Sequence, residues 1–384
     1  MNSIFLERTN QPSARRTSPE IRSKTFLPLD KSLLLLSVFF IIIGLIFTYS
    51  SSAFDSLVYF KRQALFDVLG IGIMFFLSQT FTNIIKIIKP VHILFAVWLL
   101  LIWVLCLPSA ANVHRWINLG FFNLQPSELA KAALIVYLAW TFGRNPDTAN
   151  DNSLLIMPLI YTLITIGLII AGKDLGIPAL MFAVAFAMFF LAGAKISKLF
   201  YLILIATPVA VIEIYRQPYR LQRLTSFLSP EQAAGSVGYQ LVHSFYAIGS
   251  GGWFGKGLGA SDLKLEYLPA AHTDFIFAIM CEEIGMIGAF FIIAAFIWLL
   301  IRGITLARSA KNPFNAYIIS GITICLTLQA FFNMCVATGL FPTKGLPLPF
   351  FSYGGSSVIV TLAMMGILLN VAAVEKRITT GDKF

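Results

Sequence analysis

Residues 31–52, KSLLLLSVFFIIIGLIFTYSSS, decide the fold of this chain. Between Lys31 and Asp55 the sequence runs for 23 residues without a charge. About 20 predominantly apolar residues are enough for a helix to cross a bilayer, whereas buried helices of soluble domains have shorter apolar runs. This stretch therefore predicts a membrane-spanning helix.

The same pattern recurs along the chain and predicts ten spanning helices. The fourth is interrupted by Lys131, and the seventh has only 14 uncharged residues between Lys198 and Glu213. The nine further spans lie within 67–86, 89–115, 127–142, 151–173, 174–195, 198–213, 283–302, 311–344 and 344–375. The predicted fold class is an all-α polytopic membrane protein with about ten transmembrane helices and one long extracytoplasmic loop, residues 215–273. A structureless loop of that length is unusual and tends to be functional.

The composition excludes most other classes of protein. Of the 384 residues, 58% are hydrophobic and 12% are charged, whereas soluble domains are about a quarter charged. Disorder, a coiled coil, a disulfide-rich secreted module and an ordinary soluble enzyme are therefore excluded. The net charge of +10 fits a membrane protein with basic inner loops better than a nucleic-acid partner. The four cysteines form no C-x-x-C pair and the four histidines lack metal-ligand spacing, so no protein-built metal site is indicated.

Lysine and arginine counts predict the orientation in the membrane. With the N-terminus inside, the inner segments hold 17 of these residues and the outer loops hold five, once the long loop is set aside. Cytoplasmic loops carry such an excess, so both termini are predicted to be cytoplasmic. The predicted organisation is a disordered basic tail at residues 1–32, a transmembrane domain at 33–374 and a cytoplasmic tail at 375–384.

Charged residues inside or beside the spans mark a candidate site. A charge in the membrane core costs about 2.5–3.5 kcal/mol on insertion scales, so it usually has a partner or a function. Glu128 and Lys131 lie on one helical face, either as an internal ion pair or as the lining of a polar cavity. Asp274 can cap the eighth helix, or it can act as a general base whose pKa is raised by apolar surroundings. Glu282 and Glu283, two turns deeper, are predicted to be structural.

The predicted topology places further charges at the same outer face. They are Arg115, Lys173, Asp174, Arg220, Arg223 and Lys344. Several cations around one or two carboxylates suit an anionic, phosphorylated substrate and acid–base chemistry. ATP chemistry is not indicated, because the phosphate-binding pattern G-x-x-x-x-G-K-[ST] is missing from the sequence. Residues 342–357, with three prolines and three glycines, form either an external loop or a re-entrant segment that lines a site.

Several segments together resemble the SEDS family of bacterial cell-wall proteins, which comprises FtsW, RodA and SpoVE. The similarity runs in family order over about residues 30–375. It rests on Arg115-Trp116, Gln125-Pro126-Ser127-Glu128 with Lys131, Asp174-Leu175-Gly176, Gly255-Lys256-Gly257, His272-Thr273-Asp274 and Pro347-Leu348-Pro349 with Ser352. Residues 264–269 and 343–347 are more similar to the division branch of the family than to the elongation branch.

The resemblance implies a peptidoglycan glycosyltransferase that polymerises lipid II during cell division. Asp274 matches the essential aspartate of the family and is expected to deprotonate or position the acceptor hydroxyl, while Lys131 and Glu128 support it as further catalytic residues. Undecaprenyl diphosphate is the expected leaving group. The expected substrate-binding residues are Arg115, Lys173, Asp174, Arg220, Arg223, His272, Lys344 and Ser352.

The resemblance also implies partners and a location. A class B penicillin-binding transpeptidase and other divisome membrane proteins are the expected partners, in the bacterial cytoplasmic membrane at the septum. No cofactor is firmly implied, although a divalent cation such as Mg²⁺ or Mn²⁺ could bind together with the substrate diphosphate. Two alternatives stay open: a flippase that moves lipid II across the membrane, and a non-enzymatic scaffold that recruits the transpeptidase.

Overall fold

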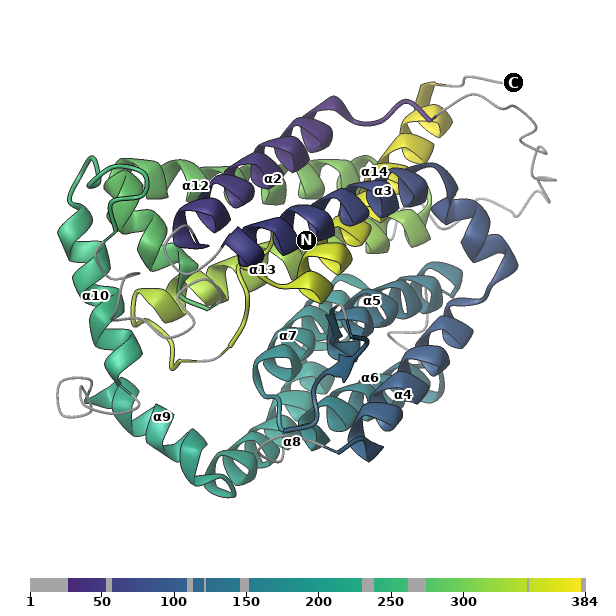
Figure 1. Ribbon diagram of the computed structural model, residues 1–384. Helices are drawn as coiled ribbons and strands as arrows, with labels where there is room; N and C mark the ends of the chain where they lie inside the picture. Colours follow the sequence, from purple (N-terminus) through teal and green to yellow (C-terminus); the bar gives the residue numbers. More distant parts are fainter. Residues whose placement is uncertain are drawn as a thin grey trace.

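The computed structural model is built almost entirely of helices (Figure 1). It describes residues 27–52, 57–108, 113–120, 122–145, 152–229, 238–261, 274–343 and 345–380. Within these ranges the strands are limited to a short antiparallel hairpin of β1 (Ile117–Asn118) and β2 (Asn123–Leu124). Residues 1–26 of the predicted N-terminal tail and residues 381–384 of the predicted C-terminal tail lie outside the described residues.

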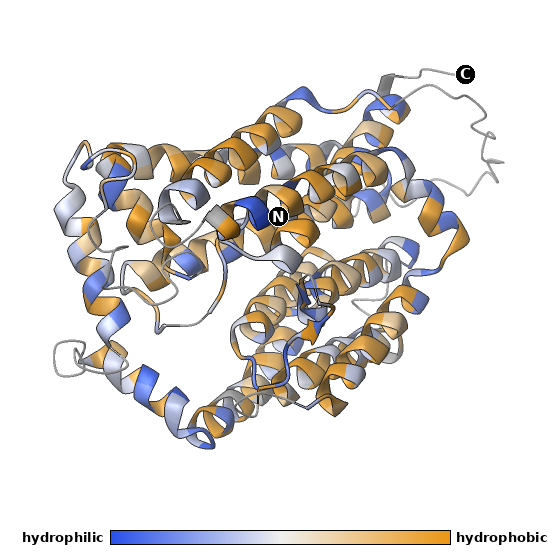
Figure 2. Ribbon diagram, viewed as in Figure 1, coloured by the Kyte–Doolittle hydropathy of each residue, from blue (hydrophilic) through white to orange (hydrophobic). Residues whose placement is uncertain are grey.

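Ten described helices correspond in order to the ten predicted spans. Seven are long and apolar enough to cross a membrane: α2 (Lys31–Ser52), α3 (Leu57–Ile87), α6 (Asn152–Ala171), α8 (Ile196–Tyr215), α12 (Ile276–Ser309), α13 (Pro313–Ala337) and α14 (Gly355–Thr380). Two shorter apolar helices are α4 (Pro90–Cys106) and α7 (Gly176–Leu191). The tenth, α5 (Pro126–Arg144), contains Glu128 and Lys131. The prediction of an all-α polytopic membrane protein is confirmed, and Figure 2 shows the apolar residues spread along these helices.

The long loop contains helices that the charge pattern did not predict. They are α9 (Pro218–Leu228) and α10 (Tyr239–Gly251), which lead from α8 back to α12 along one side of the molecule (Figure 1). Pro218 occupies the first turn of α9, where its missing N–H costs nothing. In α10 the Ser244 hydroxyl donates to the carbonyl of Ala337 at 2.7 Å. Because both helices are too short to span a membrane, a search for spans could not detect them.

Helix α12 begins at Ile276, close to the predicted start of the eighth helix at Asp274, although the run of uncharged residues begins only after Glu283. Glu282 and Glu283 lie inside the helix because each has a partner. Glu282 forms an ion pair with Lys256 at 2.7 Å, and Glu283 accepts a hydrogen bond from Ser50 of α2 at 2.6 Å. The prediction that these carboxylates are structural is confirmed for the pairing of both side chains.

A glycine-rich loop closes on a break in α12. Gly285 has a left-handed backbone (φ 67°), and the amides of Lys256 and Gly257 donate to the carbonyls of Glu282 and Glu283 at 2.9 and 3.0 Å. A Cβ on Gly285 would lie 2.3 Å from the amide nitrogen of Gly255. The Gly255-Lys256-Gly257 motif therefore binds the backbone of α12 at this break, which explains its need for glycine.

The core centres on α13, which packs against α5, α7, α12 and α14. The segment of residues 345–354, which joins α13 to α14, buries Leu346, Leu348 and Phe351 in this core. Phe350 of this segment stacks on Phe40 of α2, with ring centroids 4.9 Å apart. Of the two alternatives for this region, the structure supports irregular backbone packed within the protein rather than an external loop.

Candidate active site

Asp274 lies two residues before α12 and is half-buried. The alternative that it caps this helix is wrong, because the N-cap residue is Phe275 and no side-chain cap bond is formed. A Cβ added to Gly345 would lie 3.0 Å from the Asp274 Oδ2 atom. The 345–354 segment therefore borders this carboxylate, and a side chain at position 345 would crowd it.

Three charged side chains act on this carboxylate. Burial raises the pKa of Asp274 to about 6; Arg223 and Arg115 counteract the rise, while Asp174 adds to it. Burial disfavours the charged form of an acid, and neighbouring charges act through space only over short distances. The structure thus places two guanidinium groups and a second carboxylate near Asp274. A carboxyl group with a pKa near neutrality suits a general base.

Arg115 reaches this region by bonding to the turn between α6 and α7. Its guanidinium donates to the carbonyl of Lys173, whose backbone is left-handed with φ 64°. The Asp174 Oδ1 atom accepts the amide of Gly176 at 3.0 Å, so this carboxylate is fixed at the start of α7. The Arg115 Nε is buried without a hydrogen-bond partner in the described part of the chain. It therefore remains able to donate to a ligand.

Arg223 and Arg220 of α9 have different environments. Arg223 donates to the carbonyl of Thr343 at 3.1 Å, and its guanidinium lies 4.5 Å from the ring centroid of Tyr219. This contact ties α9 to the loop beside Asp274. Arg220 instead pairs with Glu213 at the end of α8, at 2.7 Å. The structure brings Arg223 to the candidate site and uses Arg220 to hold the α8–α9 junction.

The Glu128–Lys131 pair lies at the start of α5. Both side chains are fully buried, and Lys131 Nζ lies 2.8 Å from Glu128 Oε2. Lys131 also donates to Gln329 Oε1 at 2.6 Å, and Gln329 Nε2 donates to the carbonyl of Pro347 at 2.8 Å. Gln329 therefore connects the ion pair to the 345–354 segment by hydrogen bonds.

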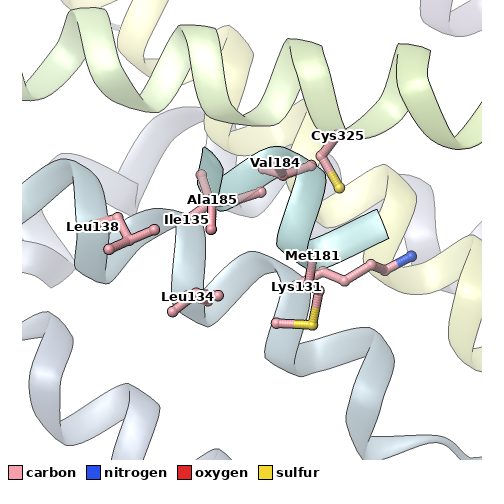
Figure 3. Close-up of a pocket in the computed structure, with 8 residues that line it drawn as sticks. All are labelled: Lys131, Leu134, Ile135, Leu138, Met181, Val184, Ala185 and Cys325. Carbon is pink, nitrogen blue, oxygen red and sulfur yellow. The ribbon is translucent and has the colours of Figure 1, made fainter. Parts of the chain in front are cut away.

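A small cavity of about 10 Å³ adjoins the buried stem of Lys131. Figure 3 shows its apolar lining, with the ammonium end of Lys131 directed away from Leu134 and Leu138. A cavity of that size holds about one water, and Leu134, Ile135 and Met181 make it apolar. It is a packing defect beside the ion pair and is too small for a substrate.

Two predicted site residues, Arg220 and Ser352, are not brought to Asp274 by the described structure. His272 and Lys344 lie outside the described residues. Ser352 is buried, and its Oγ accepts the amide of Leu348 at 2.7 Å, so it shapes a turn of the 345–354 segment.

For a metal site, the described residues contain no cluster of three or more His, Cys, Asp or Glu side chains. Asp174 and Asp274 alone would need oxygens of the substrate to complete the coordination of a cation.

Two residues that connect this site were missed at the level of sequence. Gln329 and Asn333 are buried amides on α13, and Asn333 Nδ2 donates to the backbone oxygens of Asp274 and Leu346 at 2.8 and 2.7 Å. Neither residue carries a charge, and only charges within the spans had marked the candidate site. Gln329 and Asn333 are four residues apart within an apolar span, and this spacing could have indicated a polar helical face.

Comparison with known proteins agrees with this architecture. The profile of the FtsW, RodA and SpoVE family, described as cell cycle proteins, matches residues 30–377. A probable peptidoglycan glycosyltransferase FtsW from Geobacter sp. (strain M18) is 38% identical over 89% of this chain and 96% of its own length. Stage V sporulation protein E of Bacillus subtilis (strain 168) is 36% identical over 89% of this chain and 96% of its own length.

Solved structures show the same fold. A chain of a peptidoglycan synthase complex, studied for its coordination of polymerization and crosslinking, superposes with a TM-score of 0.77. It is 26% identical, with 91% of this chain and 99% of that chain covered. The rod shape determining protein RodA of Thermus thermophilus gives a TM-score of 0.67 at 26% identity, covering 91% and 98% of the two chains. The present chain belongs to the FtsW, RodA and SpoVE family.

Proposed function

We propose that this chain is a peptidoglycan glycosyltransferase that polymerises lipid II at the outer face of the bacterial cytoplasmic membrane. The names of its relatives support the class of enzyme. One structural observation carries the mechanism: the half-buried carboxyl of Asp274 borders Gly345, next to the Thr343 carbonyl that binds Arg223. Burial raises the pKa of this carboxyl to about 6, and Arg223 and Arg115 counteract the rise. A base and an anion-binding group are thus close together, as transfer of a sugar from a diphosphate requires.

Asp274 accepts the proton of the acceptor sugar's 4-hydroxyl group, whose oxygen attacks the anomeric carbon at the lipid-linked end of the growing chain. The bond between that carbon and the diphosphate oxygen breaks, and undecaprenyl diphosphate leaves with the electron pair. A single displacement at an α-linked donor inverts the configuration and gives a β-1,4 bond. This assignment rests on the geometry and the raised pKa of the carboxyl.

Arg115 and Arg223 bind the diphosphate of the donor and stabilise the negative charge that develops on it. Asp174 holds the turn that carries Lys173, and Lys131, paired with Glu128, supports the segment beside the base. Lys173, whose carbonyl binds Arg115, is a further proposed contact of the headgroup, as are His272 and Lys344, which lie outside the described residues. Arg220 holds α9 through Glu213 instead. A divalent cation, if bound, would be held by substrate oxygens together with Asp174 or Asp274, and it would neutralise the diphosphate.

We place the protein at the septum, with both termini in the cytoplasm. The polyprenyl tail lies in apolar grooves between helices. A class B penicillin-binding transpeptidase and other divisome membrane proteins are its proposed partners. The similarity to a chain of a complex that couples polymerization and crosslinking supports a crosslinking partner.

The test uses purified protein with its transpeptidase and labelled lipid II. Asp274→Asn should abolish glycan chains while leaving the protein folded, because removal of a general base costs roughly 10²–10⁴-fold in rate. Asp30→Asn is the matched control, since Asp30 is tied to Arg302 beside the start of α2. Wild-type rates from Asp274→Asn would refute the catalytic assignment. Wild-type protein that moves lipid II without polymerising it would establish the flippase instead, and normal division of Asp274→Asn cells would favour the scaffold.

A further inference from the structure

Two buried amides on α13 connect Asp274 and Lys131 to the 345–354 segment. Gln329 and Asn333 are 0% and 1% exposed, and they lie one turn apart on the same helical face. Asn333 Nδ2 donates to the backbone oxygens of Asp274 and Leu346. Gln329 accepts from Lys131 and donates to the carbonyl of Pro347. The proposed reaction assigns no role to either side chain.

The orientation of the Asn333 amide is fixed by its neighbours. Its NH₂ group faces two carbonyl oxygens, and the flipped amide would place an oxygen against both. Its Oδ1 is buried without a hydrogen-bond partner among the described residues. An unpaired buried acceptor is destabilising, so this residue is costly at a position that only fills space. What it provides is a link between the residue before α12 and the 345–354 segment.

We propose that Asn333 and Gln329 are positioning residues for this reaction, an inference that rests on the proposed function. Asn333 holds Asp274 against Leu346. Gln329 holds the adjacent Pro347 against Lys131. Because both amides project from one rigid helix, α13 sets the distance between the base and the ion pair. A shift of about 1 Å in such a reacting group can cost roughly a hundredfold in rate.

A purely structural role is the competing explanation. Irregular backbone within a membrane protein needs donors for its carbonyls, and the two amides supply them. Both roles predict some loss of stability when an amide is removed. Only positioning predicts that folded protein turns over more slowly while it binds substrate normally. Asn315 is the matched control, because it is buried on the same helix and donates to Glu375 at 2.7 Å, far along α13 from the site.

The first experiment compares Asn333→Leu, Gln329→Leu and Asn315→Leu in the full-length protein with its transpeptidase. Polymerisation of lipid II is measured over a range of concentrations, together with the thermal midpoint of each variant. The two site variants should lower kcat roughly 10–100-fold and leave KM nearly unchanged, whereas Asn315→Leu should lower only the thermal midpoint. Wild-type kcat in a site variant overturns the role of that residue.

The second experiment does not depend on activity. Cysteines replace Asp274 and Gly345 in a protein whose four native cysteines have been replaced, and the rate of disulfide closure reports whether position 274 is held against the segment. The pair should close readily, and Asn333→Leu should slow it several-fold while Asn315→Leu does not. An unchanged closing rate in Asn333→Leu overturns the proposal. If wild-type protein makes no glycan, the proposed function fails, and the disulfide result alone decides whether Asn333 holds Asp274.

Discussion

Two lysine–glutamate ion pairs of the transmembrane domain can be compared directly. Lys131 and Glu128 are both fully buried, 2.8 Å apart, and they are connected through Gln329 to the segment beside Asp274. Glu282 is equally buried, but its partner Lys256 is 30% exposed. Glu282 also accepts hydrogen bonds from Ser250 and Ser261, so its charge does not depend on Lys256 alone. The first pair depends on one cation and supports the site, whereas the second is redundant and closes a loop.

The largest effect is expected from breaking the first pair. Lys131→Met leaves the Glu128 charge buried without its cation, and breaking a buried pair costs about 3–5 kcal/mol. The thermal midpoint in detergent should fall sharply and glycan synthesis should be lost. Combining it with Glu128→Gln removes the unpaired charge, so the midpoint should recover while polymerisation does not. Wild-type polymerisation by the double variant would mean that the pair is only structural.

A large loss of stability is also expected at the break in α12. Gly285→Ala places a Cβ 2.3 Å from the amide nitrogen of Gly255 at φ 67°, and the backbone strain alone costs about 1–3 kcal/mol. Calorimetry or thermal unfolding in detergent should show a lower midpoint. Gly72→Ala on α3 is the control, because open space surrounds that position. Equal midpoints for the two variants would show that the glycine-rich loop does not clamp α12.

The pH dependence of kcat/KM distinguishes the effects of Arg223 and Asp174 on the pKa of Asp274. A general base works when ionised, so kcat/KM should fall as the pH drops through about 6, the raised pKa of Asp274. Arg223→Gln removes a charge that lowers this pKa and should move the acidic limb to higher pH. Asp174→Asn removes a charge that raises it and should move the limb lower, each by about one unit. Shifts in the same direction, or none, would mean that the limb belongs to another group.

The smallest effect is expected at the second ion pair. Lys256→Met leaves Glu282 with its hydrogen bonds from Ser250 and Ser261, and partly exposed pairs contribute about 1 kcal/mol or less. The midpoint should fall slightly and polymerisation should be unchanged. A loss as large as that of Lys131→Met would remove the contrast between the two pairs.

The sequence allowed the spans to be predicted because charges flank most of them. The count of uncharged residues began the eighth span only after Glu283, but the expectation that Asp274 caps this helix placed its start two turns earlier, close to Ile276 where α12 begins. Glu282 and Glu283 lie within the helix because Lys256 and Ser50 satisfy them from distant segments. Helices α9 and α10 were not predicted, because their lengths are below that of a membrane span.

The candidate site was predicted only in part. Motifs and topology selected Asp274, Arg115, Asp174 and Arg223, which the structure brings together. The sequence did not indicate that Arg220 would be held by Glu213. Asn333 was missed because an uncharged amide in a span is detected only through its contacts, and those join residues that are 59 and 13 positions away.

The most direct test of the central claim is chemical labelling of a cysteine at position 274 in intact cells. In the proposed mechanism this position opens to the outer face beside an anion site. An Asp274→Cys variant without its native cysteines should react with a membrane-impermeant thiol reagent before lysis, and in purified protein undecaprenyl diphosphate should slow that reaction. Labelling only after lysis, or labelling that undecaprenyl diphosphate does not affect, would contradict it.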